Sequence, residues 1–342
     1  MRTGGSDTRG RRTYAALILI LCLCLVCTTV VSAASDKKKT NLVYVSTPPG
    51  TSIYSIAIAQ TQVLSRYTNL EVSVQPALGS QAMPGLLASK DAHFANVGIC
   101  SIWEFTKGIN IDKPYPMLRV LQGGHEVMFG FITREDSPIK SIPDLKGRKV
   151  TADFPTFKML AALGIWAMQA YGVDPSTVKI LKAENTTQAI KDLADGRTEV
   201  ALSSIEGPMM KELVAKTKIR VLPFGADKMA FVHGKNPGLF LVQTPAGLTG
   251  IEAGLPVISS PTTLHTTSEL PEEYAYLTVK TMLEKYDELV PASPYLKQYS
   301  ANRAVRMTPV LYHPGAVRYY KEKGLWTNEV DELQAKLLRE TK

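Results

Sequence analysis

The sequence predicts an α/β fold with parallel or mixed sheets that carry helices on both faces. A strand pattern at residues 41–46 leads into an apolar-periodic helix at 53–64, and the same order returns with a strand at 71–75. A second series of alternating strands and helices begins at residue 149. The length of 342 residues, less an export segment of 34, suffices for two domains of ordinary size.

Further elements are expected in the following order. The first series continues with a strand at 92–97, a helix at 102–107, and strands at 117–121 and 127–133 on either side of Gly123 and Gly124. The second series has strands at 149–152, 177–181 and 199–203 and helices at 157–171, 186–193 and 208–215. An extended apolar segment at 256–266 then precedes a long helix from about residue 270 to 286.

Residues 1–34 are predicted to be a cleaved secretory signal peptide, which places the mature protein in the periplasm. Four arginines precede an apolar run at residues 15–27, and Ser32, Ala33 and Ala34 supply the small residues of a cleavage site. An uncleaved membrane anchor is the alternative. The apolar stretch at 15–31 is, however, shorter than the roughly 20 residues that a spanning helix needs.

Removal of this segment leaves Cys100 as the one cysteine of four, so the mature chain can form no internal disulfide. The net charge of +8 falls to +5, because four arginines and Asp7 contribute +3 within residues 1–34. The remaining basic residues are spread along the chain without interleaved aromatic residues. No nucleic-acid partner is therefore expected.

Two strand-to-helix junctions predict a ligand site. Residues 47–52 follow the first strand and residues 77–81 follow the second, and both turns are rich in small or hydroxyl-bearing side chains. Such turns point free backbone N–H groups of the next helix into one crevice, an arrangement that favours an anion. We therefore expect a small acidic ligand.

The candidate ligand contacts lie in these two turns and in three further segments. They are Thr47, Gly50, Thr51, Tyr54, Gly79, Ser80, Gln81, Trp103, Phe154, Thr156, Phe157, Ser203 and Ser204. Each has a structural alternative: the glycine and serines can turn the chain or cap helices, and the large aromatic residues are more often part of a core.

Enzyme and metal motifs are not found. The five histidines lack His-x-Glu or His-x-x-x-His spacing, and one mature cysteine cannot form a typical structural zinc site. The chain has no Gly-x-Ser-x-Gly elbow, phosphate-binding lysine loop or dinucleotide fingerprint. We expect a binding protein without a cofactor, not an enzyme.

The stretch from Thr308 to Gly324 reads Thr-Pro-Val-Leu-Tyr-His-Pro-Gly-Ala-Val-Arg-Tyr-Tyr-Lys-Glu-Lys-Gly. It is similar to the carboxyl-terminal signature of the TAXI family, the solute-binding proteins of tripartite ATP-independent periplasmic (TRAP) transporters. The segments at 87–91, 142–147 and 193–196 also follow the order of that family.

The resemblance implies a type II periplasmic-binding-protein fold, in which a ligand binds between two α/β lobes joined by crossing segments. Lobe 1 would comprise residues 40–128 and 260–342, and lobe 2 residues 129–259. It further implies a monomer that delivers a small carboxylate to a TRAP permease. An ABC-type substrate-binding protein and a periplasmic ligand sensor for a membrane kinase are the alternatives.

Three turns depart from the TAXI pattern. Prolines 48 and 49 replace glycines of the first loop, and Met83 stands where asparagine is usual. In the second lobe, residues 152–157 read Ala-Asp-Phe-Pro-Thr-Phe in place of a Gly-Ser-Gly-Thr turn. The two phenylalanines favour a carboxylate with an apolar or aromatic body over glutamate or a C4 dicarboxylate. Asp153, if it faces the cleft, would repel a second carboxylate.

Overall fold

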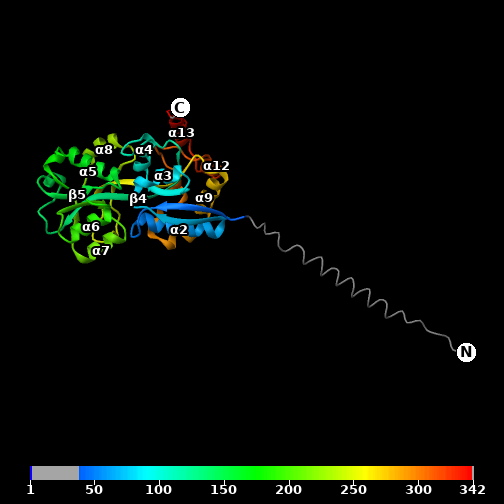
Figure 1. Ribbon diagram of the computed structural model, residues 1–342, viewed down its shortest axis with the longest axis horizontal. Helices are drawn as coiled ribbons and strands as arrows, with labels where there is room; N and C mark the ends of the chain where they lie inside the picture. The colour runs from blue at the N-terminus through cyan, green and yellow to red at the C-terminus, as the bar shows by residue number, and fades with distance from the viewer. Residues whose placement is uncertain (2–37, 341–342) are drawn as a thin grey trace. The chain divides into compact units, whose positions relative to one another are not determined.

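The computed structural model describes residue 1 and residues 38–340. The predicted signal peptide, with its three cysteines, therefore lies outside the described residues apart from Met1. Within the described part, no helix is long and apolar enough to cross a membrane. The fold described below is that of residues 40–340, shown in Figure 1.

A single mixed sheet runs through the fold in the order β2-β1-β3-β10-β4-β7-β5-β6, with β8 beside β4 and β9 beside β10. Its strands are β1 (Thr40–Ser46), β2 (Leu70–Pro76), β3 (Phe94–Gly98), β4 (Leu118–Arg134), β5 (Lys149–Asp153), β6 (Lys179–Lys182), β7 (Val200–Ser204), β8 (Ile219–Val221), β9 (Phe240–Gln243) and β10 (Pro256–Thr267).

Twelve α-helices accompany the sheet in the described residues. They are α2 (Ser52–Tyr67), α3 (Met83–Ala88), α4 (Ile99–Lys107), α5 (Lys158–Ala170), α6 (Thr186–Ala194), α7 (Pro208–Lys216), α8 (Met229–Lys235), α9 (Glu272–Glu284), α10 (Tyr286–Leu289), α11 (Ala301–Ala304), α12 (Pro314–Glu322) and α13 (Asn328–Glu340). The elements predicted from sequence are present, with ends that differ by at most three residues, apart from one strand pair discussed below.

The core is divided into two hydrophobic clusters. One gathers buried residues from 42–121 and 264–320, and the other gathers Cys100 and residues from 127–258. We call the parts of the chain around them the first and second lobes. The second lobe, with α5, α6 and α7, lies on the left of Figure 1, and the first lobe, with α2 and α9, lies beside it.

The long antiparallel strands β4 and β10 join the two lobes. Their pairing extends from Ile258 opposite Phe129 to Thr267 opposite Leu118. β10 also pairs with β3 of the first lobe and with β9 of the second. Two α/β lobes connected by crossing strands form the type II periplasmic-binding-protein fold that the resemblance implied.

The prediction of two strands separated by Gly123 and Gly124 is wrong, because β4 is continuous through both glycines. Their role is close packing rather than a turn. A Cβ atom at Gly124 would lie 2.1 Å from the ring of Tyr299, and one at Gly123 would lie 2.7 Å from the carbonyl oxygen of Arg303. Glycine lets the segment that carries Tyr299 and Arg303 pack directly on the backbone of β4, with no side chain between them.

Candidate ligand-binding site

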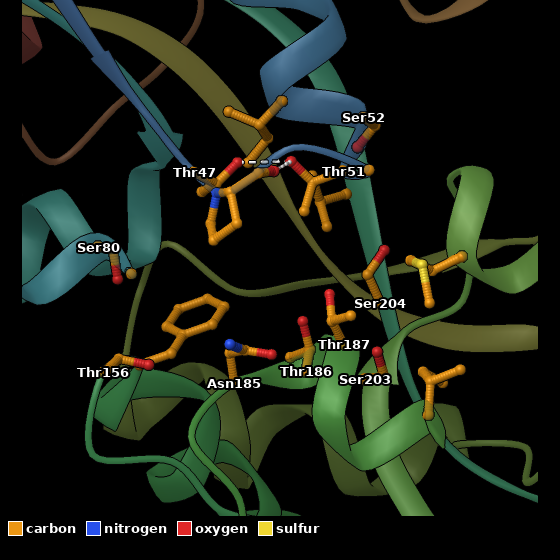
Figure 2. A pocket seen from close by; sticks show the side chains of 18 of the residues that line it. Thr47, Thr51, Ser52, Ser80, Thr156, Asn185, Thr186, Thr187, Ser203 and Ser204 are labelled. Carbon is orange, nitrogen blue, oxygen red and sulfur yellow. Dashed lines mark hydrogen bonds between the residues drawn. The ribbon is translucent and has the colours of Figure 1, made fainter. Parts of the chain in front are cut away.

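A pocket lies between the loops of the two lobes, at the carboxyl ends of β1, β2, β3, β5 and β7. Its volume is about 110 Å³, several times the space that one ordered water requires. Figure 2 shows side chains converging on it from both lobes. The polar lining side chains are Thr47, Thr51, Ser52, Ser80, Thr156, Asn185, Thr186, Thr187, Ser203, Ser204 and Glu206.

Three α-helices begin at this pocket: α2 from the first lobe, and α6 and α7 from the second. The side chains of Thr51 and Asn185 cap α2 and α6 by accepting hydrogen bonds from the third helical N–H groups, at 3.2 Å and 3.0 Å. The N–H groups of the first two residues of an α-helix have no partner within the helix. The N–H groups of the first two residues of α2 and of α6 are therefore available to a ligand. In α7 the first residue, Pro208, has no N–H, so the N–H groups of the second and third residues are available instead.

All six residues that carry these N–H groups line the pocket: Ser52, Ile53, Thr186, Thr187, Met209 and Met210. The positive ends of three helix dipoles add to the effect of the N–H groups. Together they provide an environment suited to a negatively charged group.

Two serine hydroxyl groups in the pocket have no hydrogen-bond partner among the described residues. Ser80 Oγ comes from the short 3₁₀ turn after β2, and Ser204 Oγ comes from the end of β7. Both atoms are buried, and a buried hydroxyl without a partner costs free energy. A ligand that binds here can satisfy both.

Apolar side chains form the rest of the wall. Phe157 and Phe129 pack edge to face, with ring centroids 6.2 Å apart, and both line the pocket. The other apolar lining residues are Pro48, Ile53, Leu78, Val97, Val127, Ile190, Met209 and Met210. The pocket therefore combines polar groups at the helix ends with a large apolar contact area.

Glu206 is the charged residue of the lining, which includes no lysine or arginine. Its side chain is 3% exposed, and its Oε1 lies 2.5 Å from Nε2 of His125 in β4. A negatively charged ligand would thus be held by N–H and hydroxyl groups rather than by a cationic side chain. No group of three or more histidine, cysteine, aspartate or glutamate residues within the described residues could hold a metal ion.

The lobes also contact each other directly at the rims of the pocket. The backbone N–H of Gln81 in the first lobe donates to the carbonyl oxygen of Thr156 in the second, at 3.4 Å. On another side, a Cβ atom at Gly207 would lie 3.6 Å from the backbone nitrogen of Ser52. The pocket is accordingly bordered by contacts between the lobes.

Nine of the thirteen residues singled out from sequence line this pocket. They are Thr47, Gly50, Thr51, Gly79, Ser80, Thr156, Phe157, Ser203 and Ser204. The first two junctions and the turns after β5 and β7 are thus brought together in space. The strands β1, β2 and β3 are parallel to one another, whereas β5 and β7 run in the opposite direction, so the carboxyl ends of the two sets face each other across the pocket.

The other four do not line it, and each has a local reason. Phe154 is completely buried in the second hydrophobic cluster, where its ring gains more from burial than at a wet pocket wall. Trp103 packs against the first cluster from α4. Tyr54 and Gln81 follow the pocket-lining turns, and their backbone N–H groups are already bonded to Thr51 Oγ1 and to the Thr156 carbonyl.

Sequence reasoning missed Asn185, Thr186, Thr187, Ile190, Glu206 and the methionines of α7. A signal existed for the first four, since Asn185 stands at the strand-to-helix junction before the predicted helix at 186–193. The reasoning applied to the first-lobe junctions would have included it. A single glutamate in a turn carries no comparable signal.

The fold and the interlobe pocket define the class of two-lobed solute-binding proteins. Residues 46–324 match the model of the NMT1-like family, so the chain belongs to that family.

Solved structures that are similar in fold to this protein have low sequence identity to it. A protein from Bordetella bronchiseptica RB50 is 13% identical over 85% of this chain and 90% of its own, with a TM-score of 0.50. The alkanesulfonate-binding protein SsuA from Xanthomonas axonopodis pv. citri, bound to MOPS, is 13% identical over 87% of this chain and 84% of its own, with a TM-score of 0.47. The periplasmic aliphatic sulphonate binding protein SsuA from Escherichia coli is 16% identical over 89% and 93%, with a TM-score of 0.46.

Proposed function

We propose that this protein is a periplasmic solute-binding protein that captures a small organic carboxylate and presents it to a membrane transporter. The observation that carries the proposal is the convergence of three helix N-termini on a pocket between two lobes. Binding through groups of both lobes would favour the closed arrangement, by no more than the difference in ligand affinity between open and closed states. This role needs no catalysis and no cofactor.

The preferred ligand, we propose, is a monocarboxylate with an apolar or aromatic body. Phe157, Phe129 and Ile190 offer it apolar contact worth roughly 25 cal/mol per Å². Glu206 disfavours a second carboxylate, because two negative charges in a buried site repel each other. Asp153, which the sequence suggested for this role, is exposed and does not line the pocket.

A thermal-shift screen of the mature protein against organic acids tests this proposal. A ligand at 100 times its Kd stabilises the folded state by roughly 2.7 kcal/mol. We expect monocarboxylates with apolar bodies to raise the melting temperature most. No shift with any carboxylate would contradict the proposal.

The transporter partner has two candidates. The similarity of residues 308–324 to the TAXI signature supports a TRAP permease, whereas an ABC transporter is equally compatible with the fold and with membership of the NMT1-like family. The gene beside this one discriminates between them: a TRAP permease gene supports the first and an ATPase gene the second. A neighbouring sensor-kinase gene, with no transport defect on deletion, would instead indicate a ligand sensor.

Export is proposed on the basis of residues 1–34. Mass spectrometry of a periplasmic fraction should find a mature protein that begins after Ala33 or Ala34. An intact segment 15–31 in the membrane fraction would contradict this and indicate an anchored receptor.

A further inference from the structure

The carboxylate of Glu206 is only half satisfied within the described part of the chain. Oε1 is bonded to His125 Nε2, and the second oxygen, Oε2, has no hydrogen-bond partner. The side chain is nearly buried, yet the residue lines the pocket between the lobes. A ligand that fills the pocket would cover this oxygen, and a carboxylate oxygen covered without a donor costs free energy. Hydrogen bonds to charged groups are among the strongest in proteins.

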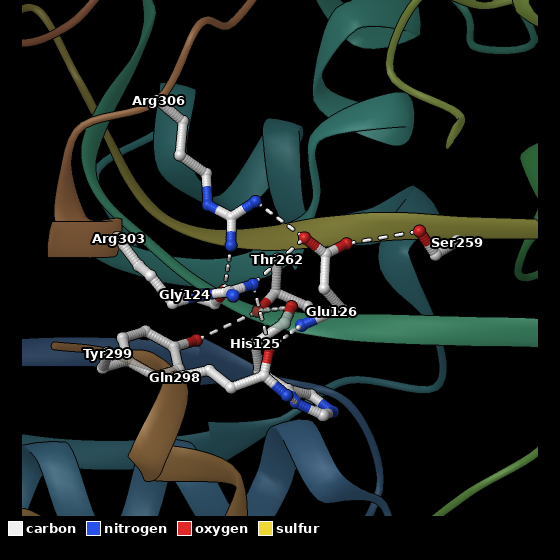
Figure 3. A network of polar contacts seen from close by, with 9 residues as sticks. All are labelled: Gly124, His125, Glu126, Ser259, Thr262, Gln298, Tyr299, Arg303 and Arg306. Carbon is white, nitrogen blue, oxygen red and sulfur yellow. Dashed lines mark hydrogen bonds and ion pairs between the residues drawn. The ribbon is translucent and has the colours of Figure 1, made fainter. Parts of the chain in front are cut away.

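His125 is itself fixed, so it holds the Glu206 carboxylate in place. Its Nδ1 lies 3.2 Å from Nε2 of Gln298, and its ring lies 4.9 Å from that of Tyr295. The other side-chain atom of Gln298, Oε1, accepts from the backbone N–H of Glu126 and from Arg303. Figure 3 shows Gln298 and Arg303 beside His125 and Glu126 of β4. Because both ring nitrogens of His125 are engaged, Glu206 cannot turn away without breaking the network.

We propose that the ligand carries a hydrogen-bond donor, a hydroxyl or N–H group, on its apolar body, and that this group donates to Glu206. The inference rests on the proposed function, since the helix N-termini are assigned to the ligand carboxylate. The ligand then has an acidic group at the helix ends, apolar contact with Phe157 and Phe129, and a donor directed at Glu206. The same carboxylate makes Glu206 a specificity determinant that rejects a second anionic group.

Calorimetry on the mature protein with phenylacetate and its three ring-hydroxylated derivatives tests this inference. Each derivative differs from phenylacetate only by one hydroxyl group, which is a hydrogen-bond donor. A hydrogen bond to a buried carboxylate should make at least one hydroxylated isomer bind about tenfold to a hundredfold more tightly than phenylacetate. 4-Carboxyphenylacetate should bind more weakly than phenylacetate.

Two substitutions separate the contributions of acceptor and charge. Glu206→Met removes the acceptor and should abolish the advantage of the hydroxylated isomer. Glu206→Gln keeps an acceptor oxygen that His125 can also contact, and it should improve binding of 4-carboxyphenylacetate relative to phenylacetate. Glu212→Gln is the matched control, because Glu212 lies on the exposed face of α7, paired with Lys216, and loses the same charge. It should change neither ratio.

The results that would refute this inference differ from those that would refute the proposed function. If phenylacetates bind but no hydroxylated isomer binds better than the parent, or if its advantage persists in Glu206→Met, the inference is wrong and the carboxylate-binding function stands. If none of the phenylacetates binds, the inference and the proposed preference for an aromatic carboxylate both fail, and the screen against other organic acids decides whether the carboxylate-binding function stands. Should Glu206→Met not fold, an unchanged preference for phenylacetate over 4-carboxyphenylacetate in Glu206→Gln overturns the role of Glu206 as a specificity determinant.

Discussion

Gly79 of the first lobe faces the backbone of Thr156 in the second lobe, with no space for a side chain between them. A Cβ atom on residue 79 would lie 2.2 Å from the carbonyl oxygen of Thr156 and 2.7 Å from its Cβ. The backbone of Gly79 is fully extended, a conformation that any residue adopts. The requirement for glycine is therefore steric, and it comes from the approach of the other lobe.

Gly79→Val should impair ligand binding without unfolding either lobe. The valine would hold the two rims apart, so second-lobe contacts with the ligand would be lost. We expect affinity to fall at least about tenfold, equal to roughly 1.4 kcal/mol. Calorimetry measures the effect, and Gly234→Val is the control, because a Cβ at Gly234 would meet nothing within 4 Å. An unchanged Kd in folded Gly79→Val would place the ligand elsewhere.

Ser80→Ala and Ser204→Ala should each weaken binding while leaving the unfolding free energy unchanged or slightly increased. Neither hydroxyl has a hydrogen-bond partner within residues 38–340, so its removal costs this part of the fold no hydrogen bond. Each loss should cost binding about 1 to 2 kcal/mol if the ligand accepts from or donates to that hydroxyl. Calorimetry measures the loss of affinity and urea unfolding measures the stability of the same variants. A fall in stability with no effect on Kd would contradict the assignment of these hydroxyl groups to the ligand site.

Phe157→Ala and Phe154→Ala should have opposite signatures. Phe157 lines the pocket, and its truncation should mainly reduce affinity for an aromatic carboxylate. Phe154 is fully buried in the second-lobe core, where loss of the ring should destabilise the fold by about 3 to 5 kcal/mol. Denaturant unfolding and calorimetry on both variants separate the roles. Equal loss of affinity in both would contradict them.

Stability should carry a pH-dependent contribution from Glu104 in α4. Burial raises the pKa of this carboxyl from 4.5 to about 7, against the opposing effect of hydrogen bonds from Asn110 and Asn236. Neighbouring Cys100 does not titrate in that range, because burial raises the pKa of its thiol to about 12.

The sign follows from proton binding. Between pH 4.5 and 7 the folded state retains a proton on Glu104 that the unfolded state has lost, so this contribution to stability declines as the pH rises. The stability of the protein relative to Glu104→Gln should therefore fall between pH 4.5 and 8, by up to about 3 kcal/mol. Urea unfolding at several pH values measures the difference, and a difference that rises with pH would refute the prediction.

The sequence was informative where structure is local. The junctions at 47–52 and 77–81 could be predicted because turn residues and helix periodicity are encoded by neighbouring positions. Gly123 and Gly124 misled for the opposite reason. Their neighbours suggest a turn, whereas the Tyr299 ring that requires them lies 175 positions away from Gly124 along the chain.

The same distinction explains the candidate site. Phe154 and Phe157 stand in one turn and look alike in the sequence, but only packing against the second lobe decides which ring is buried and which faces the pocket. Glu206 was missed because its significance depends on His125, a partner on β4 that lies 81 positions away in the sequence. Contacts between distant residues could not be deduced from either residue alone.

The most direct test of the central claim is calorimetric titration of the mature protein with phenylacetate, its ring-hydroxylated derivatives, glutamate and succinate. The account predicts one-to-one binding of an aromatic monocarboxylate, tighter than glutamate or succinate and weakened by Phe157→Ala. Tighter binding of glutamate that Phe157→Ala leaves undiminished would contradict it.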